Sequence, residues 1–289
     1  MARARETRPL RDAYDAAGTV ASTDPYFAEW AAASERTRSA LRCELDVAYG
    51  SGERERVDLF PATRPGAPCY LWIHGGYWRR LDKSFFSFVA APVVASGGAT
   101  AIANYPLVAT ATLDEIVDAI RRAFAWIARN ATRLNADPQR IVVGGHSAGG
   151  QLAGMLAATD WSAYSLPADS VKGVFVVSGL FDLEPVRLSH VNEWLRVDAE
   201  TARRNSPSLH LPTRSIPLVA AVGGDETSEF RKQSQDYVQA WSRAGHPARY
   251  LEPTGHNHFS IVSELANDRT ELAGLLVGLL RQTPAVDGS

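Results

Sequence analysis

The sequence has very little cysteine and no long apolar run, and each shortage excludes a class of protein. Only two of the 289 residues are cysteines, Cys43 and Cys69. They do not have the spacing of a redox or zinc motif, and two scattered cysteines make no disulfide framework. No stretch approaches the roughly 20 apolar residues needed to cross a bilayer. We therefore expect two reduced packing cysteines and no membrane partner.

An excess of charge of one sign is also missing. The 30 Lys and Arg residues against 32 Asp and Glu residues give a formal net charge of −2 at pH 7. This balance gives no reason to expect nucleic acid as a partner. The first residues, MARARETRPLRDAYD, are charged and lack the apolar segment of a secretory signal. Together these features predict a soluble, cytoplasmic protein.

Short apolar runs alternate with amphipathic ones along most of the chain, which predicts an α/β fold with a mostly parallel central sheet and helices on both faces. The runs CELDVAY and RVDLF flank a GSGE turn, which favours an initial hairpin. The expected strands are 43–49, 56–60, 69–74, 99–105, 140–145, 173–179, 216–224 and 248–253. The expected helices are 112–131, 147–159, 227–245 and 267–282.

Two segments fall outside this alternation but do not divide the chain, so we predict one domain over residues 1–289. The first, about 1–40, carries aromatic residues that could dock on the body of the domain. The second, about 180–214, is polar and separates two strands that should be neighbours. We expect it to form a small cap of short helices over the sheet.

The stretch GGHSAGG predicts a catalytic serine. Gly145-His146-Ser147-Ala148-Gly149 follows a predicted strand, opens a predicted helix and fits the pattern G-x-S-x-G. A sharp turn from strand to helix holds the serine in a strained conformation, and small residues two positions away on either side avoid clashes. We expect Ser147 to be the nucleophile.

The stretch IHGGYW, also after a buried strand, is the expected oxyanion loop. Glycine lets the backbone approach a substrate closely, so we expect the N–H groups of Gly75 or Gly76, together with that of Ala148, to bind the oxyanion. We expect His74, at the strand end beneath the loop, to be a structural hydrogen-bonding residue.

In this fold the chain order is serine, acid, histidine. Asp225 follows a buried strand and precedes a helix, and it is the expected acid, with Glu226 and Asp182 as alternatives. The base should come from TGHNHFS, where His256 and His258 are both candidates. No cluster of Cys, Asp or Glu accompanies them in the sequence, so we expect no metal and no cofactor.

The stretches HGGYW, GHSAGG, GGDETSEF and NHFSIV together resemble the serine-hydrolase kynurenine formamidases (arylformamidases), near the carboxylesterases of the α/β-hydrolase fold. Residue by residue, the resemblance implies Ser147 as nucleophile, Asp225 as acid and His258 as base. His258 is favoured over His256 because the family's histidine is followed directly by phenylalanine, as His258 is by Phe259.

The resemblance implies hydrolysis of an N-formylkynurenine-type arylformamide, a reaction of tryptophan catabolism, through an acyl-enzyme. A carboxylesterase acting on short acyl or aryl esters is the alternative, and a non-catalytic binding protein of this fold is a third. A small aromatic or apolar amide or ester is the expected partner, and a homodimer stays open. Residues expected to line the substrate pocket are Tyr77, Trp78, His146 and Trp194.

Overall fold

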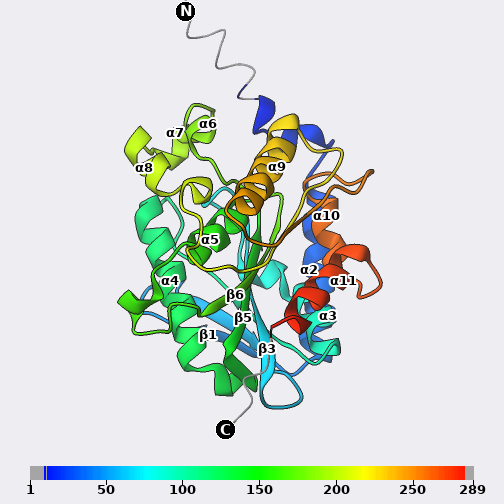
Figure 1. Ribbon diagram of the computed structural model, residues 1–289. Coiled ribbons are helices and arrows are strands. Elements are labelled where there is room, and N and C mark those ends of the chain that lie inside the picture. The colour runs from blue at the N-terminus through cyan, green and yellow to red at the C-terminus, as the bar shows by residue number, and fades with distance from the viewer. Residues whose placement is uncertain (1–9, 11, 284–289) are drawn as a thin grey trace, which may run out of the picture.

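The computed structural model describes residues 10 and 12–283, which build an eight-stranded sheet between layers of helices (Figure 1). The strand order is β1-β2-β4-β3-β5-β6-β7-β8. β2 pairs antiparallel with β1 and with β4, and all later pairs are parallel. The strands are β1 Glu44–Ala48, β2 Arg56–Phe60, β3 Ala67–Ile73, β4 Ala99–Ala103, β5 Ala136–His146, β6 Val171–Val177, β7 Leu218–Ala221 and β8 Ala248–Leu251.

Helices cover both faces of the sheet. In Figure 1, α4 (Leu113–Arg129) and α5 (Ala148–Ala157) lie on one side, and α3 (Ala90–Ala95) and α11 (Glu271–Arg281) lie on the other. α4 begins with a capping box in which Thr112 and Glu115 bond each other's backbone N–H groups. The remaining helices are α2 Asp24–Ala40, α6 Glu184–Arg187, α7 Asn192–Leu195, α8 Ala199–Arg204, α9 Ser228–Arg243 and α10 Ser260–Ser263.

The predicted α/β-hydrolase architecture is confirmed. Each expected strand is present, and the first two form the expected antiparallel pair. The central strands are buried along almost their whole length except for residues 137–140 of β5, since helices cover both faces. Within the described residues, no helix combines the length and the apolar character needed to cross a bilayer.

The parallel register brings the functional loops to one edge of the sheet. Ile73 of β3 pairs with Gly145 of β5, and His146 of β5 pairs with Val177 of β6. The loops that follow β3, β5 and β6 therefore begin side by side at the carboxyl edge of the sheet. Ligands of open α/β sheets bind at the carboxyl ends of the strands, and this edge is where the site lies.

The two segments outside the alternation lie at this edge. Residues 180–214 contain α6, α7 and α8, which stand together above the sheet in Figure 1. The expected docking segment starts in residues 1–9 and 11, which lie outside the described part of the chain. Its described part contains the buried side chains of Tyr14 and Trp30, and Trp30 donates a hydrogen bond to Ser263 at the end of α10. The division into body, docking segment and cap stays a prediction.

Candidate active site

Ser147 lies between β5 and α5 in a strained backbone conformation, with φ 57° and ψ −120°. Non-glycine residues in such regions cost about 1–3 kcal/mol and cluster at functional sites. The two flanking glycines make the turn possible. A Cβ atom at Gly145 or Gly149 would lie 2.5 or 2.0 Å from the carbonyl oxygen of Ile73. The sequence pattern therefore has a direct steric cause.

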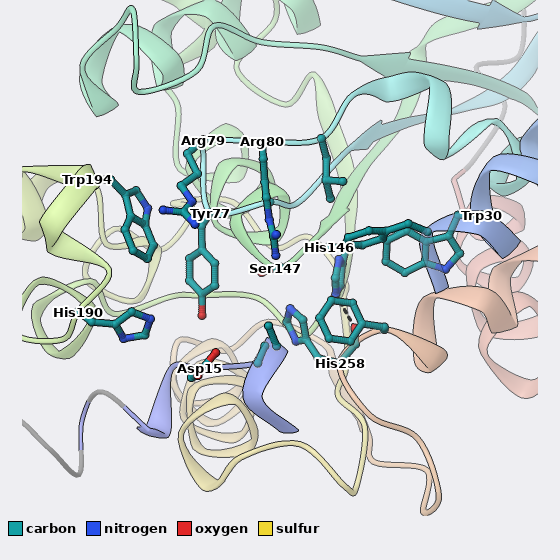
Figure 2. Close-up of a pocket in the computed structure, with 16 residues that line it drawn as sticks. Asp15, Trp30, Tyr77, Arg79, Arg80, His146, Ser147, His190, Trp194 and His258 are labelled. Atoms are coloured by element: carbon teal, nitrogen blue, oxygen red, sulfur yellow. Dashed lines mark hydrogen bonds between the residues drawn. The ribbon is translucent and has the colours of Figure 1, made fainter. Parts of the chain in front are cut away.

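Ser147 and His258 line one pocket, which also reaches the cap and the N-terminal segment (Figure 2). Its cavity volume is about 140 Å³. An apolar cavity of about 150 Å³ holds one benzene molecule, so this cavity has room for about one aromatic ring. Its walls include Trp30, Tyr77 and Trp194, whose rings suit such an occupant.

A buried carboxylate orients the imidazole of His258. Nδ1 of His258 lies 2.6 Å from Oε2 of Glu226, and both side chains are almost fully buried. The other oxygen, Oε1, accepts hydrogen bonds from the hydroxyl of Ser178 at 2.5 Å and from the N–H of Gly223 at 2.7 Å. The hydroxyl of Ser178 and the N–H of Gly223 act as donors to this carboxylate, and Nδ1 of His258 is a third donor in the tautomer that carries its proton there. Such a carboxylate fixes a histidine with Nδ1 protonated and Nε2 free.

The prediction that Asp225 is the acid partner is wrong in this geometry, and the alternative Glu226 takes its place. The N–H of Glu226 bonds the carbonyl of Gly223, so residues 223–226 form a β-turn. Asp225 occupies the third position of the turn and is exposed, whereas Glu226 is buried. The other alternative, Asp182, caps the N–H of Glu184 and does not reach His258.

The two histidines of TGHNHFS have different surroundings. The ring of His258 packs against those of His146 and Phe230, with centroid distances of 4.5 and 4.4 Å. His256 does not line the pocket; its carbonyl oxygen accepts the N–H of Asp225 at 3.0 Å. A Cβ atom at Gly223 would lie 2.2 Å from that same oxygen. His256 thus joins the two loops through its backbone.

The loop after β3 contains successive left-handed conformations, with φ 107° at Gly76, 52° at Tyr77 and 56° at Trp78. Gly76 lines the pocket, and Gly75 lies behind it, where a Cβ would be 3.0 Å from the Cβ of Ser147. Among the described residues, the N–H groups of Gly75, Gly76 and Ala148 find no hydrogen-bond acceptor. The N–H of Ala148, together with that of Gly75 or Gly76, is suited to bind an oxyanion beside the serine.

His74 lies beneath this loop and is fully buried. Its ring stacks on Tyr105 at 4.4 Å, and its Nε2 lies 3.1 Å from Oδ1 of Asn104. Burial lowers the pKa of His74 to about 4, which keeps the ring neutral at pH 7. These contacts give His74 a structural place, away from the pocket.

Three of the four expected pocket residues line the cavity: Tyr77, His146 and Trp194. Trp78 does not, and that prediction is wrong. Its ring is fully buried and donates a hydrogen bond from Nε1 to Gln151 of α5 at 3.0 Å. The left-handed φ at both Tyr77 and Trp78 sends the first ring to the pocket and the second into the core.

His146 forms part of the pocket floor. Its Nε2 lies 2.9 Å from the carbonyl oxygen of His258, which makes Nε2 the donor. Burial, followed by the nearby charge of His258, lowers the pKa of His146 well below its usual range. A neutral His146 leaves no second positive charge beside His258.

Sequence reasoning missed Ser178 and the N-terminal contribution to the pocket. Ser178 has a left-handed φ of 51° directly after β6 and supports Glu226. Asp15, Ala16, Phe27 and Trp30 line the pocket from the N-terminal segment. The serine after the run GVFVV was the available signal for Ser178, since it ends a strand at the same edge. No group of three or more His, Cys, Asp or Glu side chains within the described residues could hold a metal ion.

Comparison with known proteins gives consistent results. The BD-FAE family model matches residues 58–224. The chain is 33% identical over 254 residues to the kynurenine formamidase of Danio rerio, covering 86% of this chain and 85% of that protein. It is 34% identical over 255 residues to the kynurenine formamidase of Salmo salar, with the same coverage of 86% and 85%.

Solved structures show the same fold. A candidate thioesterase from Silicibacter sp. TM1040 superposes with a TM-score of 0.81 at 30% identity, covering 94% of this chain and 98% of that one. An esterase from Pyrobaculum calidifontis superposes with a TM-score of 0.72 at 16% identity, covering 89% and 91%. Both are similar to this chain in the arrangement of sheet and helices.

Proposed function

The chain belongs to the BD-FAE family and to the family of the kynurenine formamidases, and on that premise we propose that it hydrolyses an aryl formamide with Ser147 as nucleophile. It is an enzyme of the α/β-hydrolase fold. N-formylkynurenine is the proposed substrate, which would give formate and kynurenine, a step of tryptophan catabolism. His258 is the proposed base and Glu226 the proposed acid.

The first half of the reaction transfers the formyl group to the enzyme. Nε2 of His258 takes the proton of the Ser147 hydroxyl while Oγ attacks the formyl carbon. The N–H groups of Gly76 and Ala148, with Gly75 as the alternative to Gly76, bind the resulting oxyanion. His258 then gives its proton to the aryl nitrogen, the C–N bond breaks, and the aryl amine leaves. A formyl ester remains on Ser147.

The second half removes this ester. Nε2 of His258 takes a proton from water as the water oxygen attacks the formyl carbon. The intermediate collapses, the proton returns to Oγ of Ser147, and formate leaves. Glu226 stays ionised throughout and stabilises the imidazolium that forms twice in each turnover.

One observation carries the proposal: His258 is bonded at 2.6 Å to a buried, fully bonded carboxylate and lines the same pocket as Ser147. Three buried donors hold Glu226 in one position, so the imidazole orientation is fixed before substrate binds. A fixed orientation of this kind lowers the cost of reaching the transition state.

The test is turnover of N-formylkynurenine by the purified protein, measured as the release of formate. We expect turnover by the wild type and a loss of about 10⁴-fold or more in kcat for Ser147→Ala. Ser51→Ala, which removes an exposed serine from the turn after β1, is the matched control and should match the wild type. Absence of formamide turnover by the wild type would end the proposal.

A carboxylesterase is the second candidate, because several similar structures and curated relatives are named as esterases. The same groups could open an ester, with an alcohol leaving in place of the amine. A comparison of N-formylkynurenine with 4-nitrophenyl acetate separates the two. Hydrolysis of the ester alone would favour the esterase.

A cytoplasmic location and a homodimer are further proposals for this enzyme. Cell fractionation tests the location, and sedimentation of the purified protein tests the dimer.

A further inference from the structure

Two neighbouring arginines, Arg79 and Arg80, line the pocket that holds Ser147 and His258. They follow directly on the oxyanion loop and are exposed at the pocket mouth. In the described part of the chain, both guanidinium groups contact aromatic rings, and neither forms an ion pair or a side-chain hydrogen bond. Each guanidinium carries five N–H donors, and these donors have no described protein partner.

Aromatic rings hold both guanidinium groups in place. The guanidinium of Arg79 lies 3.9 Å from the centre of the Trp194 ring, which comes from the cap. That of Arg80 lies 5.8 Å from the Phe27 ring, which comes from α2. Figure 2 shows both side chains extending from their loop toward the pocket. A contact with a ring face uses no hydrogen bond, so it leaves the N–H donors of a guanidinium free for a ligand.

The positive charge of this pair is not neutralised nearby. Among the described residues that line the pocket, Asp15 supplies the only carboxylate, and its Oδ1 accepts the N–H of Gly18. Partial loss of solvent around the Arg80 guanidinium, followed by the charge of Arg79, lowers the pKa of Arg80. This direction is that of a cation without a compensating anion. An anionic ligand group would relieve the imbalance.

We propose that Arg79 and Arg80 form a subsite for a carboxylate of the substrate. An arginine fork binds a carboxylate through two parallel hydrogen bonds, which makes the contact strong and directional. The aryl ring would occupy the cavity, and the carboxylate would extend from it to the pocket mouth. The preferred substrates are therefore aromatic amides that carry a carboxylate on the amine side. The placement on the amine side rests on the proposed function, in which the acyl group is only formyl.

The test is equilibrium binding of two amine products to the full chain, measured by titration calorimetry. Kynurenine carries the carboxylate; kynuramine, its decarboxylated analogue, has the same ring, ketone and amine without it. We expect the wild type to bind kynurenine at least about tenfold more tightly than kynuramine, because hydrogen bonds between charged groups contribute about that much to affinity. In Arg79→Gln/Arg80→Gln the two affinities should agree within about twofold.

Arg64→Gln is the matched control, because it removes an exposed arginine outside the pocket and should keep the wild-type preference. Thermal unfolding midpoints establish that the variants fold. Equal affinities in the wild type, no measurable binding of either product, or an unchanged preference in the double variant would overturn the subsite. Turnover is read separately: if neither N-formyl derivative is hydrolysed while kynurenine is still preferred, the proposed reaction fails and the subsite stands.

Discussion

Which carboxylate meets His258 depends on one β-turn, and residue types alone do not reveal it. Asp225 and Glu226 are adjacent acids in the same loop, and the position of Asp225 directly after the strand favoured the wrong one. The turn of residues 223–226 directs Glu226 inward and Asp225 outward. Glu226 also has one more methylene group than Asp225, which extends its reach. Ser147 was predictable because the strand–helix turn leaves no room for a Cβ atom at the flanking Gly145 and Gly149, so the turn leaves a pattern in the sequence.

At the same scale, the two histidines should respond differently to replacement. We expect His258→Ala to lower kcat about 10⁴-fold or more, since the base and its oriented proton are lost. His256→Ala should lower it modestly, because its contact with Asp225 is made by the backbone. Steady-state kinetics on N-formylkynurenine measures both. The reverse ranking would move the base to His256 and leave the reaction class in place.

Among the elements, buried strands and amphipathic helices were predictable, and the N-terminal helix was not. The strands of the central sheet are continuous apolar runs because helices cover both faces. The sequence of α2 lacks a clear helical repeat of apolar residues. Its buried face includes Ser34 and Thr37 beside Trp30 and Ala33. Thr227, just before α9, does not cap that helix with its side chain: its hydroxyl donates to the carbonyl of Ala13 at 2.5 Å.

The N-terminal segment should support the active site through Tyr14. This buried ring packs against Phe230, which in turn contacts the ring of His258. The backbone carbonyl oxygen of Tyr14 accepts a hydrogen bond from the hydroxyl of Tyr77 at 2.5 Å. We expect Tyr14→Ala to lower the free energy of unfolding by about 3–5 kcal/mol and to raise KM. Urea unfolding and steady-state kinetics measure the two effects.

Tyr14→Phe is the matched control. It removes only the hydroxyl, which accepts a 2.9 Å bond from Gln233, and should cost about 1 kcal/mol. An unchanged KM in Tyr14→Ala would show that the segment stabilises the fold without shaping the pocket.

For the whole molecule, stability should fall as the solution becomes mildly acidic, because His146 is buried in its neutral form. Its pKa is well below the usual range in the folded state, while in the unfolded chain it is about 6.5. Below pH 6.5 the unfolded chain therefore binds more protons than the folded one. Linkage then lowers the free energy of unfolding by up to about 1.4 kcal/mol per pH unit for this group.

The contribution of His146 can be isolated by replacement. Urea unfolding between pH 7 and pH 5 should give a shallower dependence for His146→Leu than for the wild type. Other titrating groups are common to both proteins and cancel in the difference. If the free energy of unfolding changes with pH equally in both proteins, His146 binds its proton equally well in the folded and the unfolded state, and the prediction is wrong.

The central claim is that a Ser147–His258–Glu226 triad hydrolyses an aryl formamide, and one comparison tests it most directly. We would measure kcat/KM on N-formylkynurenine for Glu226→Gln and Asp225→Asn. An amide at position 226 favours the wrong tautomer of His258, so Glu226→Gln should lose about 10³–10⁴-fold. Asp225→Asn changes an exposed side chain and should stay within about threefold of the wild type. A large loss for Asp225→Asn with an active Glu226→Gln enzyme would contradict the account.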